Sequence, residues 1–291
     1  MQQAEQDYSV GQLCQVLGVS RSAYYAYKAG DTYQLSPQKQ QLAEQVKDTF
    51  TTHKRRYGSR RLLVELQEQG VRIGRYQIRS IMQQQELIAI QPKSFVPRTT
   101  DSRHGKRLCQ NLLLDEPRPV APNRIWVSDI TYLPLVSGAW AYLGTWMDLY
   151  SRVVVGWQVE EHMGDSLIIR PLKKALDWRR PAAGLIVHSD RGGQYVSDEL
   201  KAMIAKHHAR QSMSRADDPY DNAFAESFFS RFKAELLEGG AFLSVEDART
   251  EIFDFIEMYY NRIRRHSALG YKSPLDFEAI YYQTNSLNLQ Q

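Results

Sequence analysis

Residues 125–135 read IWVSDITYLPL, a stretch rich in the β-branched and aromatic side chains that are typical of a strand. Ser137 and Gly138 form a turn signal after it, and residues 139–150 and 153–160 have the composition of two more strands. Parallel strands need a crossover of about a dozen residues or more, and these connections are far shorter. The stretch therefore predicts three antiparallel strands in succession.

Helices and strands alternate after these three strands. Asp165 is expected to cap a helix that runs to about residue 178. Pro171 within this helix predicts a kink or a short first segment. A buried strand over residues 185–190, a helix over 200–208 and a longer helix over 222–237 follow. This order predicts an α/β domain of ribonuclease-H-like type, with helices on a mixed five-stranded sheet. A flavodoxin-like sheet is excluded, because it would require helices between the first strands.

The chain before residue 90 has a helical pattern instead. Residues 9–30 predict two short helices that break at Gly18 and restart after Ser20, which is typical of a helix-turn-helix. Residues 57–69 and 74–85 predict a second such pair. We expect these all-α units to bind DNA. A plain helical hairpin, or a basic helix face in solvent, would have the same pattern, and both alternatives stay open.

The net charge of +4 hides an uneven distribution along the chain. Residues 1–120 hold 18 Lys and Arg against 11 Asp and Glu, a net charge of +7, whereas residues 121–291 have a net charge of −3. The basic half is expected to meet a polyanion, and binding through phosphates weakens as salt rises. The side chains of this half that are expected to contact DNA are Arg21, Tyr24, Lys28, Arg55, Arg56, Arg60, Arg61, Arg75 and Arg79.

These patterns divide the chain into five expected regions. Two helix-turn-helix regions, 1–35 and 36–90, precede a Pro-rich basic linker over 91–122. An α/β core is expected over 123–240 and a helical extension over 241–291, in which Ser244 caps a packing helix that runs to Ile263.

Cysteine content and hydropathy limit where the protein acts. Only two cysteines, Cys14 and Cys109, occur, which excludes a disulfide framework and fits a reducing cytoplasm. The uncharged run from Ile130 to Met147 is long enough to suggest a membrane span, but Pro134 and the hairpin turn interrupt it. We therefore expect no membrane segment.

Three acidic residues lie on elements that the fold could bring together. Asp129 lies on the first strand, Asp190 comes 61 positions later after the strand LIVHS, and Glu226 lies in the long helix a further 36 positions on. Clustered carboxylates raise one another's pKa, and hard divalent cations remove this penalty. Each residue alone would usually be a solvated carboxylate. The apolar strand around Asp129 and the glycines after Asp190 favour a site for Mg²⁺ or Mn²⁺.

Four strings extend this pattern over nearly the whole chain: WVSDITYLP, HSDRGGQY, QSMSRADDPYDNAFAESFFSRFKAEL and YNRIRRHSALGYKSP. Together they resemble the bacterial insertion-sequence transposases of OrfB type, family three, within the DDE or retroviral-integrase superfamily. The resemblance covers about residues 8–277. Its most specific part is an Asp and a Glu with 35 residues between them, followed by a Lys seven positions later.

The resemblance implies an enzyme that cuts DNA at the ends of an insertion sequence and joins those ends to new sites. Asp129, Asp190 and Glu226 correspond to the catalytic triad of the family, which binds two Mg²⁺ or Mn²⁺ ions. Lys233 corresponds to a DNA-contacting base, and Asn222 lies in the string before the Glu. His188 is a possible accessory residue or a structural one. The basic end beyond the last long helix adds Arg262 and Arg265 as expected DNA contacts.

The partners that follow from this resemblance are double-stranded DNA, as element terminal repeats and as target, and further copies of the chain in at least a dimer. The resemblance also implies an upstream-frame partner or fusion. The expected location is the bacterial cytoplasm, with the protein at the nucleoid when it is bound to DNA. Two alternatives remain. A Mg²⁺-dependent nuclease of the same fold would cut without joining, and an inert DNA-binding regulator would do neither. Intact acidic residues at all three positions count against the regulator.

Overall fold

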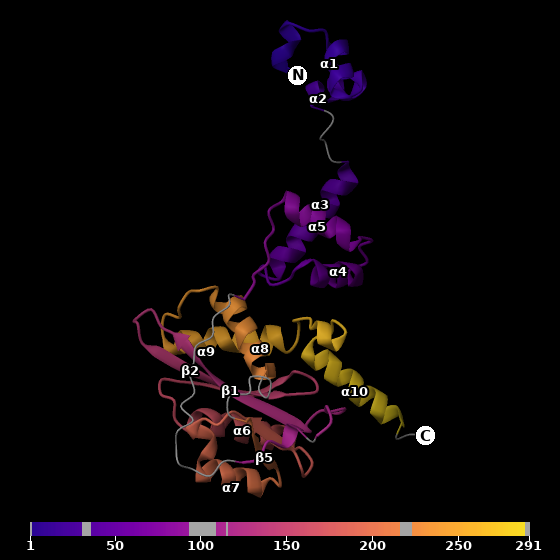
Figure 1. Cartoon of the computed structure of the whole chain (residues 1–291). Coiled ribbons are helices and arrows are strands. Elements are labelled where there is room, and N and C mark those ends of the chain that lie inside the picture. Colours follow the sequence, from indigo (N-terminus) through magenta and orange to yellow (C-terminus); the bar gives the residue numbers. More distant parts are fainter. Residues whose placement is uncertain (1, 31–35, 93–108, 115, 216–222, 289–291) are drawn as a thin grey trace. The chain divides into compact units, whose positions relative to one another are not determined.

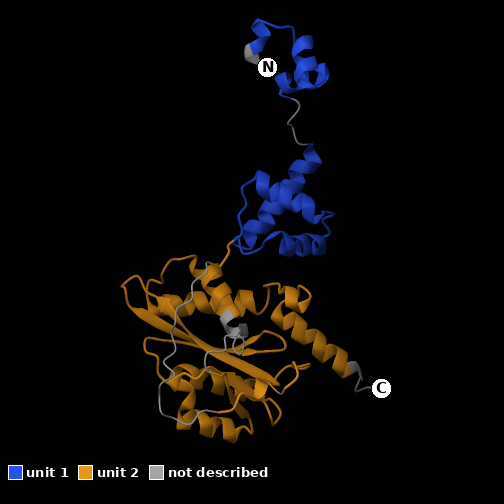
Figure 2. Cartoon of the chain, in the orientation of Figure 1, with its two compact units in different colours: residues 1–89 blue, residues 90–291 orange. Residues whose placement is uncertain are grey.

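The chain folds into two compact units, residues 1–89 and residues 90–291 (Figure 1, Figure 2). The computed structural model describes residues 2–30, 36–92, 109–114, 116–215 and 223–288. Within these ranges the first unit is helical, and the second combines a sheet with helices. No helix in the described part of the chain is long and apolar enough to cross a membrane.

The first helix pair of the N-terminal unit agrees with the sequence prediction. α1 (Val10–Leu17) ends at Gly18, whose φ of 65° is a left-handed conformation that glycine adopts without strain. α2 (Arg21–Ala29) begins after Ser20, whose hydroxyl accepts a hydrogen bond from the Ala23 N–H at 3.1 Å. The Ser20 hydroxyl is thus the N-cap that the sequence indicates. A short 3-10 helix, η1 (Gln2–Gln6), precedes the pair.

The N-terminal unit also contains α3 (Pro37–Thr52), α4 (Ser59–Glu68) and α5 (Arg75–Gln84). α4 and α5 are the second predicted pair, and α3 is an additional helix that packs against both of them. The buried side chains of these three helices include Ala43, Val46, Phe50, Leu62, Leu66 and Ile78. The unit therefore has an apolar core of its own.

The second unit is built on a five-stranded sheet with the order β3-β2-β1-β4-β5. Its strands are β1 (Ile125–Pro134), β2 (Trp140–Asp148), β3 (Val154–Glu160), β4 (Ile186–Ser189) and β5 (Arg210–Met213). The first three strands are antiparallel neighbours, as their short connections predict, and β4 and β5 run parallel to β1. This mixed sheet confirms the expected ribonuclease-H-like fold.

Helices cover both faces of the sheet (Figure 1). On one face, α8 (Ala223–Phe232) and α9 (Val245–Phe253) share a core with Val127 and Ile186. On the other face, α6 (Ser166–Arg179) and α7 (Asp198–Lys206) share a core with Trp126 and Val187. Because side chains alternate along a strand, odd-numbered residues of β1 face α8 and even-numbered residues face α6.

Two glycines let α6 lie close against the sheet. A Cβ added at Gly144 of β2 would lie 2.7 Å from the carbonyl oxygen of Leu167, and one added at Gly156 of β3 would lie 2.5 Å from that of Pro171. α6 runs from residue 166 to 179 with Pro171 inside it. The predicted Asp165 cap is wrong: the backbone of Asp165 is already helical, and its side chain makes no capping hydrogen bond.

Both long helices predicted after residue 220 change to a wider π-helix before they end. α8 is followed by η5 (Lys233–Leu237), and α9 by η6 (Asp254–Tyr260). Ser244 caps α9 as predicted, because its hydroxyl accepts a hydrogen bond from the Asp247 N–H at 3.1 Å. The chain then continues through η7 (Ser267–Leu269) to α10 (Pro274–Asn288). Turns of π-helix are frequent at functional sites.

The outer edge of β3 is met by side chains from the C-terminal helices. The amide of Asn261 accepts a hydrogen bond from the Val154 N–H at 3.0 Å and donates one to the Val154 carbonyl at 3.1 Å. Arg249 of α9 donates to the Val159 carbonyl at 3.3 Å. Residues 241–288 belong to the same compact unit as the sheet.

The outer edge of β5 is met by a segment from the expected linker. The Met213 N–H donates to the Gln110 carbonyl at 3.3 Å, and the Leu112 N–H donates to the Ser212 hydroxyl at 2.9 Å. η3 (Leu112–Leu114) follows directly. Residues 109–114 are therefore packed, whereas residues 93–108 of the expected linker lie outside the described residues.

Candidate active site

Two of the three predicted carboxylates lie side by side at the centre of the sheet. β1 and β4 are parallel neighbours, and their pairing aligns Val127 with His188. Asp129 lies two residues beyond Val127 on β1, and Asp190 lies two residues beyond His188, directly after the end of β4. Neighbouring strands are about 4.8 Å apart. By the alternation along β1, Asp129 shares the face of Val127, which α8 covers, and Asp190 directly follows the strand that puts Ile186 on the same face. Both residues are half-buried.

A backbone N–H group orients each of these carboxylates. The Ile130 N–H donates to Oδ1 of Asp129 at 2.8 Å, and the Gly192 N–H donates to Oδ1 of Asp190 at 2.9 Å. Gly192 leaves little room for a side chain at this turn, because an added Cβ would lie 3.1 Å from Oδ1 of Asp190. The backbone N–H of Gly192, one of the two glycines that the sequence indicated beside Asp190, therefore orients this carboxylate.

The helix that carries the third acidic residue covers the same face. Phe228, Phe229 and Phe232 of α8 join the core that contains Val127. Glu226 lies on α8, and its side chain is outside the described part of the structure, as is the whole of Asn222. The backbone therefore puts the residue on the element that faces Asp129.

Lys233 begins the π-helix at the end of α8 and is half-buried. Burial lowers the pKa of Lys233, and the negative charge of Asp129 opposes this effect. The Lys233 ammonium group is thus within electrostatic reach of the first carboxylate. A cation at this position can hold an anionic group, such as a phosphate, next to Asp129.

The donor set fits a hard divalent cation. Asp129 and Asp190 offer oxygen ligands, which Mg²⁺ and Mn²⁺ prefer, and neighbouring carboxylates need such a charge to lie together. Among the described side chains no three His, Cys, Asp or Glu groups converge, but the Glu226 side chain is not among them. The described part of the site therefore supplies two carboxylate ligands.

His188 is fully buried between β4 and β5. Its Nδ1 lies 2.8 Å from the Ser212 hydroxyl and its Nε2 lies 3.1 Å from the Ser214 hydroxyl. Arg191 also donates to the Ser214 carbonyl, at 2.8 Å. The two ring nitrogens thus link β4, the strand before Asp190, to β5 and to the residue that follows β5. These contacts support a structural role for His188. An accessory role in chemistry stays a prediction.

Tyr195 lies beside the candidate site and was not singled out by the sequence reasoning. Its phenol lies on the α6 face of the sheet, directly behind the carboxylates, and is 1% exposed. Burial, together with the charges of Asp190 and Asp129, raises the pKa of Tyr195 well above its ordinary value. The string HSDRGGQY contains this residue, but only the fold reveals that the side chain turns back toward β1.

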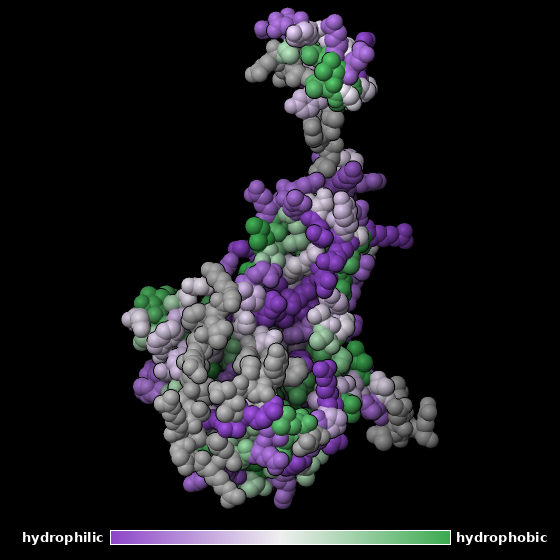
Figure 3. Space-filling view, in the orientation of Figure 1, coloured by the Kyte–Doolittle hydropathy of each residue, from purple (hydrophilic) through white to green (hydrophobic). Residues whose placement is uncertain are grey.

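The predicted DNA contacts of the N-terminal unit differ in how accessible they are. Tyr24 and Arg56 are buried, and Arg61 is half-buried above the Tyr57 ring, 5.6 Å from its centroid. Lys28 is exposed and forms an ion pair with Glu5 at 2.8 Å. The remaining predicted residues are exposed: Arg21, Arg55, Arg60, Arg75 and Arg79. The visible surface of this unit over α3–α5 is largely hydrophilic (Figure 3). A DNA-binding role for each stays a prediction.

The two arginines predicted in the C-terminal region make backbone contacts. Arg262 is exposed and donates to the Glu257 carbonyl at 3.0 Å. Arg265 is half-buried and donates to the Tyr271 carbonyl at 3.1 Å. Neither contact neutralises the charge of the guanidinium group, so the prediction that they contact DNA stays open.

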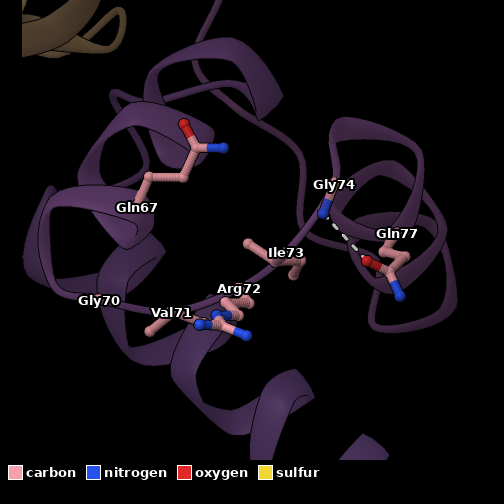
Figure 4. A pocket seen from close by; sticks show the side chains of 7 residues that line it. All are labelled: Gln67, Gly70, Val71, Arg72, Ile73, Gly74 and Gln77. Atoms are coloured by element: carbon pink, nitrogen blue, oxygen red, sulfur yellow. Dashed lines mark hydrogen bonds between the residues drawn. The ribbon is translucent and has the colours of Figure 1, made fainter.

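An open groove of about 450 Å³ lies at the turn between α4 and α5 (Figure 4). The side chain of Gln77 accepts a hydrogen bond from the Gly74 N–H at 2.9 Å and so caps the start of α5. The groove belongs to the N-terminal unit and contains none of the predicted catalytic residues. Its lining residues are Gln67, Gly70, Val71, Arg72, Ile73, Gly74 and Gln77.

Known protein families match both units of the chain. Two families described as integrase core domains match residues 119–219 and 207–274, and an HTH-like domain matches residues 37–95. Two solved structures are similar at low identity. The HTLV-2 integrase catalytic core in complex with magnesium is 17% identical with a TM-score of 0.43, over 55% of this chain and 99% of that one. A simian T-cell lymphotropic virus intasome chain is 14% identical with a TM-score of 0.45, over 80% of this chain and 74% of that one.

Curated relatives are similar over almost the full length of the chain. The uncharacterized 31 kDa protein of insertion element IS600 from Shigella sonnei is 37% identical, over 93% of this chain and 99% of the relative. The transposase InsF of insertion sequence IS3A from Escherichia coli K12 is 38% identical, over 94% of each. The sheet and these matches define a polynucleotidyl transferase of the DDE integrase class, an enzyme of DNA transposition. More particularly, the chain belongs to the family of IS3 insertion-sequence transposases.

Proposed function

We propose that Asp129, Asp190 and Glu226 are the catalytic carboxylates of this transposase and together hold two Mg²⁺ or Mn²⁺ ions. The observation that carries the proposal is the position of Asp129 on β1 and of Asp190 directly after the adjacent parallel strand β4, under the helix that bears Glu226. When bound, the ions would supply positive charge for the attacking and leaving oxygens of a phosphodiester. A relative of this fold has been solved with magnesium, which agrees with the oxygen donors present here.

The chain's own residues orient the ligands and the DNA. The N–H groups of Ile130 and Gly192 hold the two aspartates, and Lys233 offers a cation for a phosphate next to Asp129. In cleavage, a water oxygen bonds to phosphorus, the bond to the 3′ oxygen breaks, and that oxygen takes up a proton. In joining, the oxygen of the freed 3′ hydroxyl bonds to a phosphorus of the target DNA, the bond from that phosphorus to the target's own 3′ oxygen breaks, and the leaving oxygen takes up the proton that the attacking hydroxyl loses. No covalent intermediate with the protein is required.

The helical unit is proposed to bind double-stranded DNA at the element ends. Its exposed arginines favour contacts with phosphates, which would position the duplex without reading its sequence. Asn222, Lys233, Arg262 and Arg265 would extend the contacts to the catalytic unit. We also propose that at least two copies of the chain act together on DNA in the bacterial cytoplasm, because joining requires two element ends to be held at once. An upstream-frame partner or fusion is compatible with this arrangement.

The test is a cleavage and joining assay on labelled element ends with Mg²⁺. Asp129→Asn, Asp190→Asn and Glu226→Gln each remove a charged ligand and keep the side-chain volume. We expect each variant to lose both cleavage and joining by several orders of magnitude and to retain DNA binding in a gel-shift assay. Asp165→Asn is the matched control, because Asp165 is exposed and its side chain makes no capping bond.

The products separate the possible functions. Nicked and joined strands from the wild type support a transposase, nicked strands alone support a nuclease, and retention on the gel without new products supports an inert regulator. Near-normal turnover by any of the three triad variants would contradict the assignment of that residue.

A further inference from the structure

Two buried hydroxyl groups meet directly behind the pair of aspartates. The Tyr195 phenol oxygen lies 2.9 Å from the Ser128 hydroxyl oxygen, and either group can donate the hydrogen bond. Ser128 directly precedes Asp129 on β1, and Tyr195 is five residues after Asp190. Because side chains alternate along β1, Ser128 faces α6 while Asp129 faces α8. This hydrogen bond therefore joins the backbones that carry the two carboxylates, from the opposite face of the sheet.

Further contacts fix Tyr195 in place. Its N–H donates to the Gly192 carbonyl at 3.0 Å, and its carbonyl accepts a hydrogen bond from the Gln211 amide of β5 at 2.6 Å. Its ring packs edge-on against Trp146 of β2, with 6.3 Å between the centroids. The turn from Asp190 to Tyr195 is thus linked to β1, β2 and β5. A shift of the phenol would move the turn that orients Asp190.

Packing alone does not account for a tyrosine here. A phenylalanine would fill the same apolar space, whereas a buried hydroxyl loses its hydration and must be hydrogen-bonded. Tyr195 and Ser128 satisfy each other at 1% and 0% exposure. Burial raises the pKa of the Tyr195 phenol further above neutrality, so the phenol keeps its proton at neutral pH.

We propose that Tyr195 is a positioning residue of the metal site: through Ser128 it sets the spacing of Asp129 and Asp190. The proposal rests on the proposed function, because it assumes that these two carboxylates bind the metal. Removing the phenol oxygen frees the turn after Asp190 from β1 without removing any ligand. The carboxylates then spend less time at the spacing that a divalent ion requires, so metal affinity falls while the chemistry of the loaded site is unchanged.

The test compares Tyr195→Phe, Ser128→Ala and the double variant in the full-length chain. Mn²⁺ binding is measured by titration without DNA, and nicking of labelled element ends is measured as a function of metal concentration. Tyr260→Phe is the matched control: Tyr260 is 4% exposed in the other core, and its hydroxyl contacts the Met147 sulfur at 3.8 Å. Thermal unfolding without metal records the cost of each lost hydroxyl to stability.

We expect Tyr195→Phe and Ser128→Ala each to weaken Mn²⁺ binding about tenfold, as outer partners of metal ligands do. The double variant should bind no more weakly than either single variant, because both substitutions remove the same hydrogen bond. Saturating metal should restore the nicking rate of Tyr195→Phe to nearly that of the wild type. Tyr260→Phe should bind Mn²⁺ like the wild type.

Three outcomes would overturn the inference. These are wild-type Mn²⁺ affinity in Tyr195→Phe, equal losses in Tyr195→Phe and Tyr260→Phe, and fully additive losses in the double variant. The Asp129→Asn variant distinguishes a failure of this inference from a failure of the proposed function. If Asp129→Asn loses Mn²⁺ binding and Tyr195→Phe does not, only the inference fails. If Asp129→Asn retains Mn²⁺ binding, the metal site is wrongly assigned and both fail.

Discussion

Arg264 and Glu235 form a buried ion pair next to the candidate site. The Arg264 guanidinium donates to both Glu235 oxygens, at 2.7 and 2.5 Å, and each side chain is 3% exposed. Burial alone would lower the pKa of Arg264, but the hydrogen bonds and charge of Glu235 outweigh it and raise the pKa above its ordinary value. Glu235 lies two residues after Lys233 on the π-helix, so the pair anchors the helix end that carries the lysine.

We expect Arg264→Met to lower the free energy of unfolding by about 3–5 kcal/mol, because it leaves a carboxylate buried without its cation. Arg264→Met combined with Glu235→Met should lose less than the sum of the single variants. Urea unfolding followed by tryptophan fluorescence measures this, since all five tryptophans lie in the second unit. Lys173→Met is the control, because Lys173 belongs to an exposed ion pair. Equal effects of Arg264→Met and Lys173→Met would contradict the prediction.

The sequence predicts those candidate site residues whose chemistry is recognisable in short strings. Asp129, Asp190, Glu226 and Lys233 stand in strings that resemble a known family, and the structure puts Asp129 near Lys233. Tyr195 and Arg264 could not be assigned in this way. A tyrosine after two glycines and an arginine in a basic run have many possible roles, and only tertiary contacts distinguish them. Arg264 stands between Arg262 and Arg265, which the sequence predicts as DNA contacts, but Arg264 is buried.

At the level of elements, the close approach of α6 to the sheet gives a second prediction. Gly144→Ala would bring a methyl group to within 2.7 Å of a backbone carbonyl in α6, which cannot move as freely as a side chain. We expect it to lower the free energy of unfolding by about 1–3 kcal/mol, as overpacking does. Gly164→Ala is the control, since the nearest atom to its added Cβ is the Ser166 hydroxyl oxygen, at 3.7 Å. Equal thermal midpoints for Gly144→Ala and the wild type would show that α6 can shift.

The elements that could be predicted are those with a strong local pattern. β1 to β4, the helix pair α1 and α2, and the helices α4 to α9 have apolar periodicity or clear turn residues. β5, with the sequence RQSM, has no such pattern and becomes a strand because β4 and the segment 109–114 pair with it. The π-helical ends of the two long helices also lack a signal, since the same residues would suit an α-helix.

For the whole molecule, the division into a basic helical unit and a catalytic unit predicts action between copies of the chain. We expect the helical unit of one copy to bind the DNA end that another copy cleaves. A triad-inactive chain with Asp129→Asn is mixed with a chain in which Arg60, Arg61, Arg75 and Arg79 are changed to Ala. Joining should recover in the mixture, because each chain supplies what the other lacks. No recovery above either variant alone would contradict the prediction.

Both outer strands of the sheet carry backbone groups that the chain itself satisfies. Asn261 pairs with Val154 on β3, and residues 109–114 contact β5. An exposed edge strand offers its N–H and C=O groups to any other chain, and such edge-to-edge pairing leads to aggregation. These contacts reduce the tendency of the sheet edges to pair with other chains. This matters in a protein whose proposed activity brings several copies together. Chains that lose the Asn261 amide should therefore become more prone to precipitate at high concentration, even where their active sites are intact.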